Sequence, residues 1–182
     1  MSTAPLLIRA EPYDNPDVTA MIGAVQEYYH TIYNGPDRSP VDPAEFAPPA
    51  GRFFVGYVDG VALAMGGWRW IDPLLDLGAE RPAEIKRMYV DTSARGHGYA
   101  RRLLAHLEST AAAAGADAAV LSTGQPQHEA IALYRSSGYH DVPRFGYFAR
   151  YGTAVHLGKW LRSPGDPGGA AATGLPGDGT GR

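Results

Sequence analysis

The chain has 182 residues, of which 45% are hydrophobic, and its formal net charge is −3. This length is enough for one domain with a hydrophobic core, and the mild acidity gives no overall basic field to attract nucleic acid or an anionic membrane. The chain contains no cysteine, no apolar run of about 18 residues and no secretion signal at its start. We therefore expect a cytoplasmic protein without disulfides, thiolate metal sites or a cysteine nucleophile.

The first half of the chain predicts a helix flanked by strands. In chain order we expect a strand at 6–9, a helix at 17–33, a loop at 34–51, and strands at 52–58 and 61–70. The loop holds five of the fifteen prolines, and it can include one short helical turn. Asp59-Gly60 is a favourable pair for a tight turn, so the two strands are expected to form a hairpin.

The second half predicts a β-α-β unit followed by further elements. We expect a loop at 71–82, a strand at 84–90, a turn at 91–98, a helix at 99–114, a strand at 118–122, a helix at 128–137 and strands at 139–145 and 153–161. Strand alternation predicts that residues 84, 86, 88 and 90 share one face. Residues 163–182 are dominated by Gly, Ala and Pro, so we expect a domain at 1–162 and a disordered tail.

The turn before the helix at 99–114 has the composition of an anion site. Backbone N–H groups at a helix start, together with the positive end of the helix dipole, suit a pyrophosphate. Gly96 and Gly98 let the chain approach an anion closely, and the guanidinium of Arg95 can bind phosphate with two hydrogen bonds. The turn lacks the Gly-Lys-Ser or Gly-Lys-Thr of a P-loop, and Arg101 replaces the last glycine of a dinucleotide fingerprint.

Two blocks of sequence resemble the signatures of the GCN5-related N-acetyltransferases, the GNAT family. Residues 95–100 read R-x-x-G-x-A, which is similar to the family's acetyl-CoA signature. Residues 127–139 match its second signature at Ala130, Leu133, Tyr134, Gly138 and Tyr139, and they carry Gln127 where asparagine is usual. The resemblance implies an α/β domain with a mixed, mostly antiparallel sheet of six to seven strands. Helices would cover both faces, and the central parallel strands 84–90 and 118–122 would splay apart.

The resemblance also implies acetyl-CoA as co-substrate, held mainly by the turn and by the preceding strand. Backbone groups of residues 88–90 would pair with pantetheine as an added strand would, and one near Met88 or Tyr89 would stabilise the oxyanion. The residues expected to bind acetyl-CoA are Met88, Tyr89, Val90, Arg95, Gly96, His97, Gly98, Tyr99, Ala100 and Gln127. The six histidines show no metal-ligand spacing, so no metal is expected.

Two residues match catalytic positions of the family. Glu84 is the expected general base, acting directly or through an ordered water, and Tyr134 is the expected acid that protonates the departing thiolate. The alternative for Glu84 is a structural ion pair with Lys86 or with an arginine on a neighbouring strand. The alternative for Tyr134 is packing of its ring against the sheet. Without a cysteine to form an acyl-enzyme, direct transfer to the amine is expected.

Aromatic side chains are the candidates for the acceptor site. Tyr29, Tyr33, Trp68, Trp70 and Tyr147 could line it, although core packing explains the two tryptophans equally well. The favoured acceptor is a small-molecule amine, such as an amino acid, a polyamine or an amine-bearing antibiotic. A protein N-terminus or lysine, or a non-catalytic acyl-CoA-binding module, are the alternatives. The oligomeric state is left open between monomer and homodimer.

Overall fold

The structure, a computed structural model, describes residues 4–33, 35 and 39–161. Within them seven strands form one sheet in the order β1-β2-β3-β4-β5-β7-β6. They are β1 (Leu7–Ala10), β2 (Gly51–Val58), β3 (Val61–Trp70), β4 (Pro82–Val90), β5 (Ala118–Gly124), β6 (His140–Asp141) and β7 (Ala154–Trp160). Neighbouring strands are antiparallel except for β4 and β5, which are parallel. This is the mixed, mostly antiparallel sheet that the family resemblance implies.

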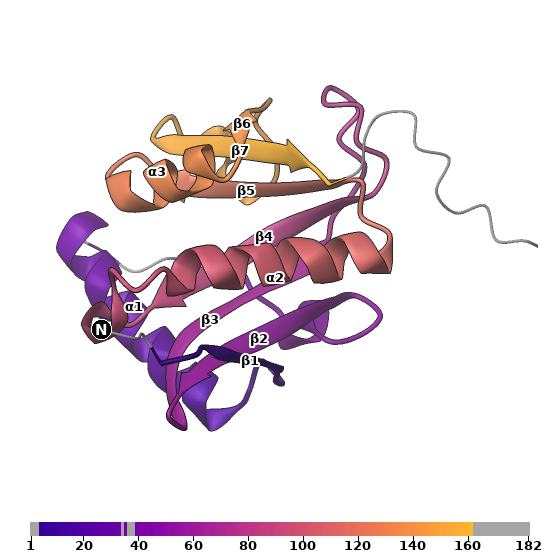
Figure 1. Cartoon of the computed structure of the whole chain (residues 1–182). Helices are drawn as coiled ribbons and strands as arrows, with labels where there is room; N and C mark the ends of the chain where they lie inside the picture. The colour runs from indigo at the N-terminus through magenta and orange to yellow at the C-terminus, as the bar shows by residue number, and fades with distance from the viewer. Residues whose placement is uncertain (1–3, 34, 36–38, 162–182) are drawn as a thin grey trace, which may run out of the picture.

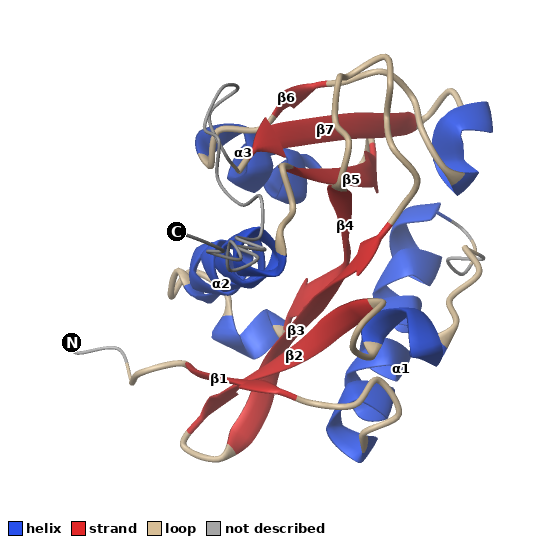
Figure 2. Cartoon of the chain, turned by 90° about the vertical axis from the view of Figure 1, so that its right-hand side faces the viewer, coloured by secondary structure: helices blue, strands red, loops and turns tan. Residues whose placement is uncertain are grey.

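Helices cover both faces of the sheet, as expected. Helix α1 (Pro16–Tyr33) lies on one face, and α2 (Tyr99–Ala114) and α3 (His128–Ser136) lie on the other (Figure 2). Three short 3₁₀ helices, η1 (Pro43–Phe46), η2 (Thr92–Ala94) and η3 (Tyr147–Arg150), interrupt the loops of the described chain. Each face has its own core, one beneath α2 with fully buried Leu103 and Leu107, and one beneath α1 with Val18.

The two central strands diverge along their length. The ladder between β4 and β5 runs only from the Pro82–Ala118 pair to the Glu84–Val120 pair. Beyond that point the strands separate, which Figure 1 shows as an opening between β4 and β5 toward the N-terminal end of α2. The backbone of β4 after Glu84 is therefore not bonded to β5, which gives a ligand an edge to pair with.

A β-bulge in β4 changes which side chains share a face. The register with β3 shifts between Met65 and Gly67, and Arg87 has a left-handed φ of 58°, which is uncommon outside glycine. The prediction that residues 84, 86, 88 and 90 share a face is therefore wrong for the last two. Met88 and Val90 pack in the α2-side core together with Ala83 and Ile85.

The last strands differ from the prediction in one respect. The strand predicted at 139–145 is wrong beyond its start, because β6 comprises only His140–Asp141. Val142 still donates to the His156 carbonyl at 3.1 Å, but Pro143 follows and has no N–H to continue the ladder. The predicted tail at 163–182 lies outside the described residues.

The described residues include neither a membrane-spanning helix nor a cluster of metal-binding side chains. None of the helices in this part of the chain is long and apolar enough to cross a membrane. No group of three or more His, Cys, Asp or Glu side chains among the described residues is placed to hold a metal ion.

Candidate active site

A groove of about 650 Å³ lies where the splayed strands meet the start of α2. Nine of the ten residues that the sequence predicts for acetyl-CoA line it, and His97 is the exception. The nine are Met88, Tyr89, Val90, Arg95, Gly96, Gly98, Tyr99, Ala100 and Gln127. The groove therefore brings together both blocks of sequence that resemble family signatures, one before α2 and one at the start of α3.

The turn at the start of α2 is shaped to receive an anion. Gly96 and Gly98 have positive φ angles of 79° and 76°, and no atom lies within 4 Å of the position a Cβ would take at either glycine. No side chain of the described residues caps α2, which begins after Gly98, so its first N–H groups lack a side-chain acceptor at a helix end where Gly98, Tyr99 and Ala100 line the groove. This geometry fits a pyrophosphate group.

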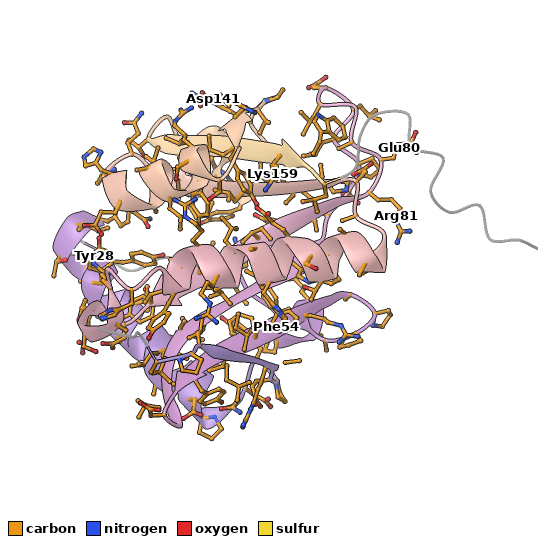
Figure 3. All side chains as sticks on the ribbon, viewed as in Figure 1. Tyr28, Phe54, Glu80, Arg81, Asp141 and Lys159 are labelled. Carbon is orange, nitrogen blue, oxygen red and sulfur yellow. The ribbon has the colours of Figure 1, made fainter. Side chains whose placement is uncertain are left out.

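Arg95 and His97 take different positions in this turn. The Arg95 guanidinium lies 5.2 Å from the centre of the ring of Tyr28, which Figure 3 shows near the N-terminal end of α2, and 3.7 Å from the exposed Glu129 carboxylate. It is therefore held at the rim of the groove. The His97 ring instead stacks on Tyr99, and its Nδ1 lies 2.9 Å from the Arg95 carbonyl oxygen, so the imidazole does not line the groove.

A second cavity, of about 330 Å³, lies on the α1 side of the splay. It contains Glu84 and Lys86 from β4, the C-terminal part of β5, and aromatic side chains of α1 and η3. The two cavities share Tyr29, Met88, Gln127 and Tyr134 as lining residues. A molecule reaching through the splay from the groove would therefore meet a second molecule at these four side chains.

Glu84 lies in a chain of alternating charges. Its side chain is 7% exposed, and its Oε2 accepts a hydrogen bond from Arg69 Nε at 2.9 Å and lies 2.8 Å from Nη2. Its Oε1 lies 3.7 Å from Lys86 Nζ, and Arg69 also pairs with Glu45 on η1. Burial lowers the pKa of Arg69, but the two carboxylates more than offset this and raise it, so its charge is fixed. Both structural partners considered for Glu84 are thus present, while its carboxylate still lines the cavity.

Tyr134 occupies the boundary between the cavities. Its position on α3 buries the ring in the α2-side core, 5.7 Å from Tyr139, and the residue lines both cavities. Burial raises the pKa of the Tyr134 phenol far above its ordinary value, and the nearby Tyr29 adds to the rise. The hydroxyl therefore remains protonated at neutral pH and can act as a donor.

The five aromatic residues predicted for the acceptor site divide into two groups. Tyr29, Tyr33 and Tyr147 line the second cavity. Trp68 and Trp70 do not, because they point to the other face of the sheet. Trp68 donates its indole N–H to Thr110 on α2, and Trp70 packs under the Arg81 guanidinium. The prediction for the two tryptophans is therefore corrected, and their role is core packing.

The sequence alone does not assign several residues in or beside the second cavity to this site. Arg69 is the register partner of Glu84, which only the pairing of β3 with β4 reveals. Lys86, which the sequence already offers as an ion-pair partner of Glu84, also lies with its Nζ 5.5 Å from the centre of the Phe148 ring. Phe148 and Tyr151 lie beside Tyr147 in and after η3, a short helix in the stretch between the strands predicted at 139–145 and 153–161, and the fold of that stretch brings the three rings together.

Comparison with known proteins agrees with this geometry. A model of the acetyltransferase (GNAT) family matches residues 22–139. A protein of Azospirillum brasilense named IAA acetyltransferase is 36% identical over 129 residues, which cover 71% of this chain and 80% of that protein. A candidate acyl-CoA N-acyltransferase of Klebsiella pneumoniae has a similar structure, with a TM-score of 0.70, 27% identity, and coverage of 88% of this chain and all of that one. The PaiA N-acetyltransferase of Thermoplasma acidophilum, solved with coenzyme A, shares the fold at 12% identity and a TM-score of 0.61, covering 85% of this chain and 99% of that one.

Proposed function

The chain belongs to the GNAT family of N-acetyltransferases, and on that premise we propose that it transfers the acetyl group of acetyl-CoA to the primary amine of a small molecule. One observation carries the proposal. A groove at the anion-binding turn and an aromatic cavity containing Glu84 meet at the splay of β4 and β5, with Tyr134 at their boundary. Residues 1–162 would form the acetyltransferase domain.

The groove residues divide the binding of acetyl-CoA between them. The N–H groups at the start of α2 and the Arg95 guanidinium would hold the pyrophosphate. The edge of β4 beyond Glu84, which the β5 ladder leaves open, would pair with the pantetheine amides. The bulge at Arg87 and Met88 turns backbone N–H groups out of the regular ladder, where one of them could stabilise the oxyanion.

The chemistry then follows from the two side chains on either side of the splay. Glu84, through a water, takes a proton from the amine, whose nitrogen forms the new C–N bond with the acetyl carbon. As the tetrahedral intermediate collapses, the C–S bond breaks and the Tyr134 hydroxyl gives its proton to the sulfur. Glu84 then releases its proton to solvent, and the Tyr134 phenolate takes up a proton from solvent, so both side chains return to their starting states.

The acceptor class is supported by the lining of the second cavity. Tyrosine rings from α1 and η3 face Lys86 and Glu84, so an amine with a flat or apolar body could pack between rings while its nitrogen faces the carboxylate. The curated relative is named for acetylation of IAA, which is consistent with a small acceptor.

The test is a pair of measurements on the wild-type protein. Calorimetry should show binding of acetyl-CoA, and a thiol-release screen should then show turnover with small primary amines and little with short peptides. Turnover with peptides alone would assign a protein acetyltransferase. Binding without turnover on any acceptor would favour a non-catalytic acyl-CoA-binding module, and no binding would refute the assignment of the groove.

A further inference from the structure

Tyr33, the last residue of α1, reaches across the second cavity to the end of β5. This cavity is the one that the proposed function assigns to the amine acceptor, and it is called the acceptor cavity below. Its hydroxyl oxygen accepts a hydrogen bond of 2.7 Å from Gln127 Nε2. The ring lies so close to Gly124 that a Cβ at that position would be 2.7 Å from Tyr33 Cζ. Glycine at 124 is therefore required for this contact, and the backbone at Gly124 has no positive φ to explain it otherwise.

The contact connects elements on opposite sides of the splay. Tyr33 belongs to the helix that covers one face of the sheet, whereas Gly124 and Gln127 belong to the junction between β5 and α3. Tyr33 also meets Tyr29 edge to face at 5.7 Å and is 39% exposed, so one side of its ring lines the cavity while the other side faces solvent. The ring therefore acts as a wall of the cavity.

Gln127 is also where the chain departs from the second family signature. It is the residue before α3, yet its side chain makes no capping hydrogen bond to that helix. It instead donates to Tyr33. Asparagine, the usual residue at this position of the signature, is one methylene shorter, so it would not span the same distance from the same backbone position.

We propose that Tyr33, Gln127 and Gly124 form a clasp that closes the α1 side of the acceptor cavity and restricts the acceptor to small amines. The inference rests on the proposed function and specifies its substrate class. A polypeptide acceptor must continue beyond its reacting amine, but the clasp occupies one route out of a cavity of only about 330 Å³. Selectivity therefore arises from exclusion of the longer molecule and does not require tighter contacts with the smaller one.

The experiment uses two conjugates that bind without reacting. In one, an acetyl bridge joins the sulfur of CoA to the nitrogen of 2-phenylethylamine. In the other, the same bridge joins it to the N-terminus of the peptide Phe-Gly-Ser-Gly-Ser-Gly, which presents the same phenethyl group on a longer chain. Calorimetry of the wild-type protein should give a dissociation constant at least about tenfold higher for the peptide conjugate, a difference of about 1.4 kcal/mol.

Three variants test what causes the ratio of the two dissociation constants, that of the peptide conjugate divided by that of the phenylethylamine conjugate. Tyr33→Ala removes the wall, and Gly124→Ala displaces the Tyr33 ring without altering it, so each should bring the ratio close to one. His30→Ala, an exposed position on the same helix, should keep the wild-type ratio. A wild-type ratio near one, or a ratio that survives both Tyr33→Ala and Gly124→Ala, would overturn the clasp. Failure of the proposed function is a separate outcome, namely no thiol release from acetyl-CoA with any amine, and it leaves the ratio measurable.

Discussion

Tyr134 combines a protonated hydroxyl with a place at the boundary of both cavities. Tyr134→Phe keeps the ring and its packing but removes the proton that the departing thiolate needs. We expect kcat to fall by roughly ten- to a thousandfold, or about 1.4–4 kcal/mol of barrier, while the KM for acetyl-CoA changes little. Steady-state kinetics over both substrates measures this. An unchanged kcat would leave Tyr134 with a packing role only.

Arg69 holds Glu84 from the neighbouring strand and is itself only 15% exposed. Arg69→Met should destabilise the protein by about 3–5 kcal/mol, because it removes the main partner of a buried carboxylate. Urea unfolding monitored by circular dichroism would measure the loss. Glu45→Gln is the matched control, since this other partner of Arg69 is 42% exposed and its loss should cost less than about 1 kcal/mol. Equal losses in the two variants would contradict a buried pair centred on Glu84.

Single residues show how far sequence patterns reach. Nine of the ten residues predicted for the cofactor line the groove, because a signature of consecutive residues keeps its meaning without knowledge of the fold. The prediction for Trp68 is wrong because its position, unlike that of the signature residues, depends on the fold. Its face depends on pairing with Ile85 across β3 and β4, and the side to which that pair points is set by packing against α2. Arg69 was missed as a specific partner of Glu84 because the same pairing was unknown.

At the scale of elements, a substitution in the turn before α2 should affect the binding of acetyl-CoA more than the stability of the fold. Gly98→Ala forces an alanine to a φ of 76° and places a methyl group in the space over the turn. We expect a loss of about 1 kcal/mol in the free energy of unfolding and an increase of at least tenfold in the KM for acetyl-CoA. The KM for the amine should stay within about twofold.

Gly115→Ala is the control for this change. Gly115 follows the other end of α2 with a φ of 107°, so alanine there also meets a backbone penalty and must displace the end of the Arg81 side chain, but it does not line the groove. Its KM for acetyl-CoA should equal that of the wild type. If the two variants shifted this KM equally, the effect would come from destabilisation of α2, and the turn would lose its role in binding.

The β4 bulge shows why element prediction stops short of site geometry. The strand itself is evident from its composition, but one extra residue opposite Gly66 reverses the alternation that follows. The sequence of residues 84–90 does not predict the left-handed backbone conformation of Arg87, because such a conformation is usually indicated by a glycine. The bulge moves Met88 and Val90 to the α2 side while Glu84 stays on the other side, so it helps to set the relative positions of the two cavities.

Across the whole molecule, the order of the strands and the splay of β4 and β5 result from pairing between strands that lie far apart in the sequence. The sequence indicates this pairing only through its resemblance to a family. Strands β1–β4 and strands β5–β7 join at the short β4–β5 ladder, and Tyr147 and Phe148 of η3 form part of the wall of the second cavity. The buried His156 lies on β7 beside this wall, with its ring 5.1 Å from Phe145. It is 4% exposed, and the backbone of Phe148 faces its ring.

His156 therefore makes the stability of the whole fold depend on pH. Burial lowers the pKa of His156 below its ordinary value, so in the window between this lowered pKa and about 6.5 the unfolded chain binds more protons than the folded one. Stability should rise with pH through that window and fall as the pH drops from 7.5 to 5.5, by at most about 1.4 kcal/mol per pH unit for this residue.

His156→Met keeps an apolar side chain in the core and removes the titrating group. Urea unfolding at several pH values should show that the variant loses less stability than the wild type between pH 7.5 and 5.5. Burial also lowers the pKa of His106, so part of the dependence should persist until that residue is replaced too. Parallel stability curves for wild type and His156→Met would mean that the imidazole finds a compensating partner when it is protonated, and the fold would then carry no proton-linked cost at this position.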